Sequence, residues 1–134
     1  MIWQGALLYD DTTSLAEATP TTITIGERTL RITSDNPARF IALDDETREQ
    51  FTLRKAGLTV SRYAAECAGR HYTLRRRGLT REIRDGAGAL VATTRGRANG
   101  NLQVDMCSEA PLVDVVFMTW ALTFIDTPAR RTLY

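Results

Sequence analysis

Residues 112–125 form one uninterrupted apolar run that contains no glycine or proline and only one charged residue, Asp114. Strands average about five to six residues, so a run of this length without a turn signal predicts a helix. Ser108 can cap this helix, Pro111 is tolerated in its first turn, and another proline follows its end. We therefore expect a helix over residues 109–126.

The expected helix is apolar around almost its whole circumference, and its only mildly polar stripe contains Thr119, Thr123 and Asp126. A helix of this kind is buried on most sides by protein or lies in lipid. At 1.5 Å per residue the run spans about 21 Å, whereas the hydrocarbon core of a bilayer is about 30 Å thick and needs about 20 residues. We therefore expect protein around the helix and no transmembrane span. A tail anchor, favoured by Arg130 and Arg131, is the alternative.

The rest of the chain consists of short runs of β-branched and aromatic residues separated by Gly, Pro, Asn or Asp, a pattern typical of an antiparallel meander of about ten strands. The expected strands are residues 2–9, 21–25, 28–34, 39–43, 51–54, 58–63, 71–76, 79–84, 89–94 and 102–107, with longer loops over 11–20 and 44–50. A chain of 134 residues has the usual length of one domain, and no linker divides it. We expect one mainly β (α+β) domain over residues 1–134, in which strands within 2–107 form a barrel or strongly curved sheet around the helix.

One sequence frame, aromatic-Thr-Leu-Arg-basic-x-Gly-Leu-Thr, occurs at residues 51–59 and again at residues 72–80. The aromatic residue and the leucine are two positions apart and share one strand face, and the glycine can supply the positive φ of a type I turn with a G1 bulge. The repeat therefore predicts two similar hairpins, whose turns converge if the hairpins stack.

Charge is segregated along the chain, although the formal total is only +1. Residues 51–100 hold eleven basic and three acidic residues, whereas residues 1–50 hold four basic and nine acidic ones. Six cations fall at or beside the two repeated turns: Arg54, Lys55, Arg75, Arg76, Arg77 and Arg81. If the turns converge, these cations form an electropositive rim that binds an anionic ligand. The alternative is that the acidic 44–49 loop neutralises them.

The sequence contains no catalytic, metal-binding or cofactor-binding motif, so we expect a protein that is not an enzyme and uses no metal or cofactor. Its single histidine, His71, opens an expected strand on the polar face, and no serine lies in a nucleophile elbow. Cys67 and Cys107 have no partner in a CxxC pair, as a zinc site would require. An enzyme with dispersed catalytic residues is the alternative.

The first residues lack the basic stretch of a secretory signal and turn acidic at Asp10 and Asp11. Two cysteines this far apart are typical of reduced thiols packed as small hydrophobic residues. We therefore expect a cytoplasmic protein.

Three segments carry a resemblance to a known fold: Tyr72-Thr73-Leu74-Arg75, the run from Glu82 to Ala92 that includes Asp85-Gly86-Ala87-Gly88, and residues 111–125. Together they resemble the tubby carboxy-terminal-like fold, which is shared by tubby domains, LURP-one-related proteins and phospholipid scramblases. The resemblance covers residues 51–126 and implies a last helix threaded through a barrel. Those families have twelve strands, two more than the sequence pattern predicts here.

The resemblance implies a binding module, because tubby domains hold phosphoinositides on a basic surface. We expect an anionic partner, either a lipid headgroup or an acidic protein, at the basic rim. A single-stranded nucleic acid stacking on Tyr63 and Tyr72 beside Arg62, Arg70 and Arg75 is a second hypothesis. The acidic flanks of the basic block argue against it. A third hypothesis is a structural domain that forms homo-oligomers through open sheet edges.

Overall fold

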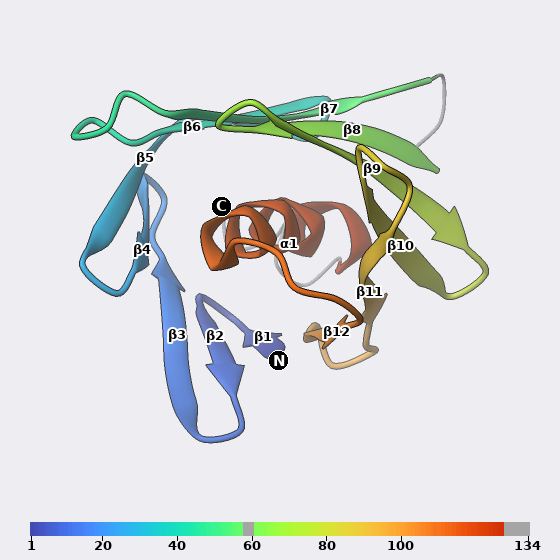
Figure 1. The fold of residues 1–134 in the computed structure, drawn as a ribbon. Helices are drawn as coiled ribbons and strands as arrows, with labels where there is room; N and C mark the ends of the chain where they lie inside the picture. The colour runs from blue at the N-terminus through green and yellow to red at the C-terminus, as the bar shows by residue number, and fades with distance from the viewer. Residues whose placement is uncertain (58–60, 128–134) are drawn as a thin grey trace.

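The computed structural model describes residues 1–57 and 61–127, which form a closed antiparallel barrel of twelve strands around one helix (Figure 1). The strands are β1 (Ile2–Gln4), β2 (Leu7–Asp10), β3 (Thr13–Ala18), β4 (Thr22–Ile25), β5 (Arg28–Asn36), β6 (Arg39–Leu43), β7 (Gln50–Lys55), β8 (Arg62–Cys67), β9 (Arg70–Arg77), β10 (Thr80–Asp85), β11 (Leu90–Gly96) and β12 (Leu102–Met106). The helix is α1 (Leu112–Asp126). Each strand pairs with its neighbours in the chain, so the expected mainly β meander around a C-terminal helix is confirmed.

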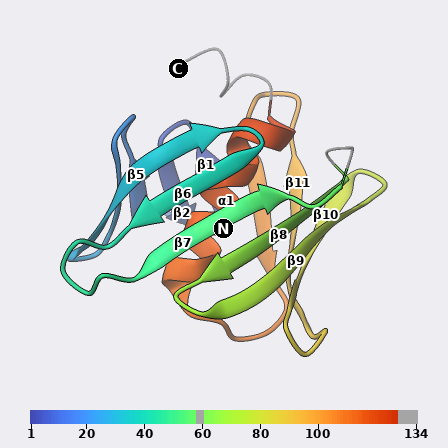
Figure 2. The ribbon, with the colours of Figure 1, turned by 90° about the horizontal axis from the view of Figure 1, so that it is seen from above.

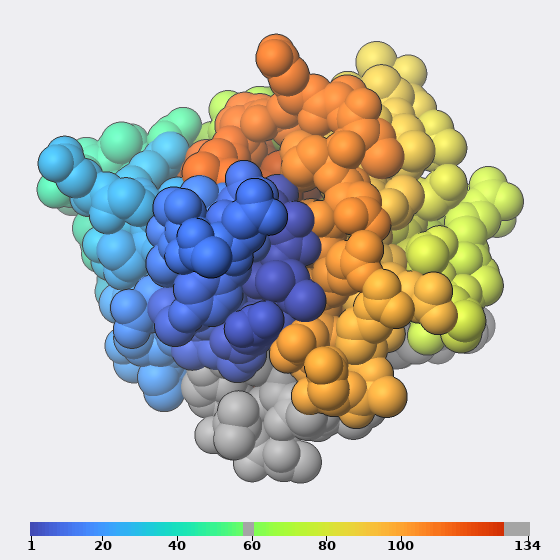
Figure 3. All heavy atoms as spheres, turned by 90° about the horizontal axis from the view of Figure 1, so that it is seen from below, coloured from blue at the N-terminus to red at the C-terminus, as the bar shows by residue number. Residues whose placement is uncertain are grey.

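The barrel closes where the first strand meets the last one. Ile2 pairs with Gln103 and Trp3 pairs with Leu102, both antiparallel. Figure 3 shows this side of the molecule, with the N-terminal strands in blue beside the orange segment that contains β12. Because the sheet is closed, these strands leave no unpaired edge in the described part of the chain, and the open edges expected for self-association are absent.

The helix α1 lies inside the barrel, and Figure 2 shows β5–β9 crossing over it. Residues 113–124 are all buried, so the expected enclosure by protein is confirmed. Small side chains on the inner face leave room for the helix; the buried ones are Ala16, Ala18, Ala42, Ala65 and Ala92. The alternation of buried and exposed residues along strands such as β8 gives the barrel a filled interior and a polar exterior.

Aromatic rings fill the space between the helix and the barrel wall. Phe40 and Phe51 of the barrel pack against Phe117, Trp120 and Phe124 of α1, with ring centroids 5.5–5.8 Å apart. These distances lie in the favourable range for tilted and edge-on pairs.

The N-terminal half contains two more strands than expected. The 2–9 segment is two strands, because Gly5 adopts a φ of 58° and turns the chain between β1 and β2. The expected 11–20 loop contains β3, whose alternation of Leu15, Ala16, Glu17 and Ala18 follows burial although its residues are weak strand formers.

Two further expectations need correction near the repeat. The strand expected over 58–63 is β8, which begins at Arg62, and residues 58–60 lie outside the described ranges. The turn after the second copy holds two residues between Arg77 and Thr80, with Gly78 first at a φ of 61°. The glycine supplies a positive φ as expected, but the type I turn with a G1 bulge is wrong there.

The helix begins at Leu112, later than expected, and Pro111 takes the N-cap position without a side-chain cap. Ser108 does not cap α1, because its hydroxyl donates to the Leu90 carbonyl oxygen at 2.8 Å. Among the described residues no helix has both the length and the hydropathy needed to cross a bilayer. Arg130 and Arg131, which favoured a tail anchor, lie outside the described ranges.

Candidate functional site

The barrel has two ends, which we name after the helix residue found at each. α1 begins at the Asp114 end and finishes at the Asp126 end. The chain leaves β7 and β9 at the Asp126 end, and the Arg76 amide there donates to the Ser61 carbonyl oxygen at 2.8 Å. The two repeated hairpins therefore turn at the same end of the barrel, as the repeat predicts.

The six predicted ligand-binding cations do not share one face. Arg54, Arg75 and Arg77 point outward from β7 and β9. Lys55, Arg76 and Arg81 occupy inward register positions, opposite Tyr63 or each other across the strands. The division follows from the two-residue period of a strand, which sends neighbouring side chains to opposite faces.

Arg81 is an interior residue, because only 1% of its side chain is exposed. Its Nε and Nη2 atoms donate to both Asp126 carboxylate oxygens at 2.9 and 3.0 Å, and its guanidinium lies 5.5 Å from the centre of the Tyr63 ring. α1 has no basic residue in its last turn, so Arg81 brings a cation to the negative end of the helix dipole. Arg81 therefore holds the helix in place and is not a surface ligand.

The outward-facing arginines of β6–β10 form a surface that we call the arginine wall: Arg39, Arg54, Arg62, Arg75, Arg77 and Arg84. Arg39 lies directly opposite Arg54, and Arg62 lies directly opposite Arg75. A groove of about 260 Å³ on this wall is lined by Arg62, Thr73, Arg75, Arg77, Glu82 and Arg84. Sequence reasoning missed Arg39 and Arg84 and considered Arg62 only for a nucleic-acid site; the cross-strand register brings all three beside the predicted residues.

Glu82 is the only carboxylate that lines this groove among the described residues. Its Oε1 lies 3.4 Å from Arg77 Nε and 3.5 Å from Arg84 Nη2. No ion pair with a described residue is recorded for Arg62 or Arg75. Like charges directly opposite each other destabilise a strand pair, so the arginine wall keeps an excess of positive charge at a cost in stability.

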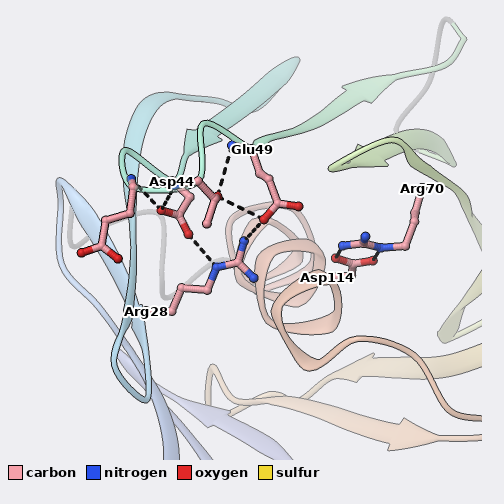
Figure 4. A network of polar contacts seen from close by, with 7 residues as sticks. Arg28, Asp44, Glu49, Arg70 and Asp114 are labelled. Atoms are coloured by element: carbon pink, nitrogen blue, oxygen red, sulfur yellow. Dashed lines mark hydrogen bonds and ion pairs between the residues drawn. The ribbon is translucent and has the colours of Figure 1, made fainter.

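The acidic 44–49 loop lies at the Asp114 end, away from the repeated turns. Arg28 donates to Asp44 Oδ2 at 2.6 Å and to Glu49, and Arg31 donates to both Asp45 carboxylate oxygens at 2.9 and 3.0 Å. Figure 4 shows the Arg28 side chain between Asp44 and Glu49. Within the described chain none of the six predicted cations pairs with this loop, so the expected alternative of neutralisation by the loop is wrong.

These ion pairs shift the ionisation of the loop. The hydrogen bond from Arg28 lowers the pKa of Asp44 and is opposed by desolvation, and the amides of Thr47 and Glu46 lower it further. The hydrogen bond from Arg31 lowers the pKa of Asp45 in the same way. The loop is therefore a charged, self-contained cluster at neutral pH.

The Asp114 end contains a second buried carboxylate. Arg70 donates from Nε and Nη2 to Asp114 at 2.7 and 2.8 Å (Figure 4). The Tyr72 hydroxyl donates to the same carboxylate at 2.5 Å. Burial, and then the bond to Asp114, raises the pKa of Tyr72. Burial also raises the pKa of the nearby Cys67 thiol. This cluster fixes the start of α1, as Arg81 fixes its end.

Beside this cluster lies an open cavity of about 380 Å³ at the Asp114 end. Its polar lining contains Asp85, Glu109 and His71 beside Arg70, which is already paired with Asp114, so it offers no excess of positive charge to an anionic ligand. In the part of the chain that the structure describes, no three His, Cys, Asp or Glu residues gather as metal ligands.

The stacking faces expected for a nucleic acid are not on the surface. Tyr63 is 1% exposed and Tyr72 is 5% exposed, because both point into the barrel. That specific expectation is wrong, although the arginines beside the two tyrosines in the sequence are exposed.

Comparisons of the chain with family models, with curated proteins and with solved structures found no match.

Proposed function

We propose that this protein is a non-enzymatic binding module that docks on an anionic lipid surface through the arginine wall. The observation that carries the proposal is the pairing of Arg62 with Arg75 across β8 and β9, both exposed and neither in an ion pair with a described carboxylate, because Glu82, which lies opposite Arg75, pairs with Arg77 and Arg84. A bound phosphate or carboxylate would relieve the repulsion between them. Each basic residue held near an anionic membrane contributes about 1 kcal/mol to binding.

The turn beside the wall favours a lipid surface over a soluble partner. Leu79 lies at the tip of the β9–β10 turn, next to Arg77, and is 71% exposed. A large apolar side chain at the tip of a basic hairpin can enter the headgroup region while the arginines contact the lipid phosphates.

The architecture supports the same proposal. A twelve-strand barrel around a C-terminal helix is what the resemblance to the tubby carboxy-terminal-like fold implies, and we propose that the chain is a module of that kind. Fold likeness is a weak warrant for function by itself, so the proposal depends on the charge of the wall. An acidic protein that binds the same arginines is the second candidate.

Co-sedimentation with vesicles tests the proposal. The protein should pellet with vesicles of phosphatidylcholine mixed with phosphatidylserine, pellet less as salt is raised, and stay in solution with phosphatidylcholine alone. Arg75→Glu should lower the partition coefficient by about tenfold or more. The matched control is Arg48→Glu, which makes the same charge change on the exposed loop at the Asp114 end and should leave the partition coefficient nearly unchanged.

The variant also has a stability readout. Arg75→Glu replaces the like-charge pair with Arg62 by an opposite-charge pair, but it also places two carboxylates opposite each other at Glu82, so its folding stability should change little while its binding weakens. Equal recovery with neutral and anionic vesicles would overturn the lipid proposal. Salt-sensitive capture on immobilised polyglutamate in its place would favour the acidic-protein candidate.

A further inference from the structure

We infer that the Asp126 end holds a second, smaller site, which binds a phosphate group inside the mouth of the barrel. A cavity of about 120 Å³ lies there, lined by Arg76, Leu79, Thr80, Arg81, Thr94, Arg95, Gly96 and Asp126. It is separate from the groove on the arginine wall, with which it shares no lining residue. The inference therefore stands independently of the proposed lipid docking.

The observation that points to a ligand is the hydroxyl of Thr94. Thr94 is 2% exposed, lines this cavity, and its Oγ1 has no hydrogen-bond partner among the described residues. A buried hydroxyl without a partner costs about 1–3 kcal/mol, so native proteins rarely leave one unsatisfied. A ligand oxygen in the cavity would accept this hydrogen bond.

The register of three strands places cations beside the hydroxyl. Arg76 of β9 lies directly opposite Arg81 of β10, which lies directly opposite Thr94 of β11. The three residues thus form one row across the inner face. Arg81 is held by Asp126 and by the Ser61 carbonyl oxygen, so it contributes only to the positive electrostatic potential of the cavity. Arg76 forms no ion pair with a described residue and can therefore contact the ligand.

The charge of the lining favours an anion. Two arginines of the inner face, Arg76 and Arg81, line the cavity with one carboxylate, that of Asp126, which leaves one positive charge. Arg95 follows the inward Thr94 along β11 and occupies an outward position. A phosphate group, which carries about −1.5 to −2 at pH 7, suits this excess of positive charge. Guanidinium groups also match the oxygen geometry of phosphate. The small volume admits a phosphate group and excludes a large ligand.

The end of α1 would repel an anion through its free carbonyl groups, but two carbonyl groups near this end accept side-chain hydrogen bonds. The Thr127 hydroxyl donates to the Thr123 carbonyl oxygen, and the Thr123 hydroxyl donates to the Trp120 carbonyl oxygen at 2.6 Å. The Arg81–Asp126 pair covers the same turn. The phosphate therefore faces the arginine side of the cavity.

Calorimetric titration of the chain with inorganic phosphate, at constant ionic strength, tests the inference. Wild type should bind one phosphate saturably, and Thr94→Val should raise the dissociation constant about tenfold or more, because valine keeps the shape and removes the donor. The matched control is Thr93→Val on the outer face, which should bind as wild type does. Arg76→Gln should weaken binding, and Arg75→Glu on the arginine wall should not.

The unliganded proteins provide a second readout. Without phosphate, Thr94→Val should be as stable as wild type or more stable, since the lost hydroxyl has no partner. A lower melting temperature for that variant together with an unchanged phosphate affinity would show that water satisfies Thr94, and would overturn the inference. Absence of saturable binding up to about 10 mM phosphate, or equal binding of acetate, would overturn it too.

Two further titrations distinguish a soluble phosphate from a lipid headgroup as the natural ligand. Glycerol phosphate and inorganic phosphate represent soluble ligands, and vesicles of phosphatidylcholine with phosphatidic acid represent a lipid headgroup. If Thr94→Val weakens only the soluble ligands, the site takes a soluble phosphate; if it weakens vesicle binding as well, the site takes a headgroup. If the wild-type protein binds inorganic phosphate but does not bind vesicles, the proposed lipid docking is refuted and the phosphate site is supported.

Discussion

Arg75, Arg76 and Arg77 are consecutive residues of one basic run, yet they have three different surroundings. Arg75 faces solvent opposite Arg62, Arg76 lies in the inner row beside Arg81, and Arg77 approaches Glu82 at 3.4 Å. The charge of such a run is visible in the sequence, but the role of each residue depends on which face of the strand it occupies.

Gly96 is a residue whose lack of a side chain is required by contact. A Cβ atom placed there would lie 2.3 Å from the Asp126 carbonyl oxygen, a backbone atom that cannot move without shifting the end of α1. Gly96→Ala should therefore lower the free energy of unfolding by about 1–3 kcal/mol, as overpacking does. Urea denaturation measures this, with Gly86→Ala as control because its nearest new contact is an ordinary 3.7 Å. Equal losses in both variants would contradict the account.

The Asp44 carboxylate makes stability depend on pH. Its pKa is lowered in the folded protein by the hydrogen bond from Arg28, so the carboxylate stabilises the fold above its unfolded pKa, about 3.9, and loses that effect as pH falls through the folded value. Asp44→Asn should have a lower free energy of unfolding than wild type at pH 7, and this difference between the two proteins should shrink below about pH 4. Urea denaturation at both pH values checks this. Asp35→Asn, an exposed control, should show no such convergence.

At the scale of elements, α1 takes its end contacts from the barrel. It lacks a side-chain cap at Pro111 and a basic residue in its last turn. Arg70 and Arg81 compensate with two-pronged bonds to Asp114 and Asp126. The helix is thus positioned along its axis by two arginines, each of which precedes its aspartate partner by more than forty residues in the chain.

Removing one of these contacts should show how much they contribute to the free energy of unfolding. Arg81→Met leaves the Asp126 carboxylate buried at the negative end of the helix dipole, so the free energy of unfolding should fall by about 3–5 kcal/mol. Removing the carboxylate as well, in Arg81→Met with Asp126→Leu, should restore most of the loss. Chemical denaturation compares the two with Arg75→Met, an exposed neighbour that should change little. A double variant as unstable as the single one would refute the charge argument.

At the scale of the whole molecule, one short contact closes the barrel. β1 contributes only three residues, and its Trp3 side chain is 1% exposed and donates from Nε1 to the Thr119 hydroxyl of α1 at 2.8 Å. Trp3 thus pairs with Leu102 of β12 through its backbone and bonds to α1 through its side chain. Closure of the barrel and attachment of the helix meet at this residue.

Trp3→Ala should remove that connection. The cavity and the lost hydrogen bond should together lower the free energy of unfolding by about 3–5 kcal/mol. Amide hydrogen exchange should also quicken in β1 and β12 more than in β7 and β8, because the closing pair loses its anchor. The control is Gln4→Ala, which changes the exposed residue next to Trp3 in the same strand and should leave exchange nearly unchanged. Uniformly unchanged exchange would show that Trp3 does not hold the closure.

Much of the fold could be predicted from local patterns in the sequence. The apolar run around Phe117 and the alternation in strands such as β9 predicted an enclosed helix and a meander, because both depend on hydrophobic periods that are readable in sequence. β3 was not predictable, since Leu15, Ala16, Glu17 and Ala18 have low strand propensity and are held by β2 and β4. The start of α1 was misplaced, because Ser108, expected as its cap, bonds to β11, whereas its end at Asp126 was predicted correctly.

The periods of the apolar residues were enough to establish the class of this protein, a helix wrapped in antiparallel sheet, and the sequence also shows that most basic residues lie within 51–100. Which arginines lie on the surface and which lie inside the barrel could be read only from the three-dimensional fold. That choice depends on cross-strand register, which brings Arg62 to Arg75 and Arg76 to Thr94 and draws Arg81 to Asp126. Register follows from burying every strand's apolar face at once, a condition on the closed barrel that no single segment contains.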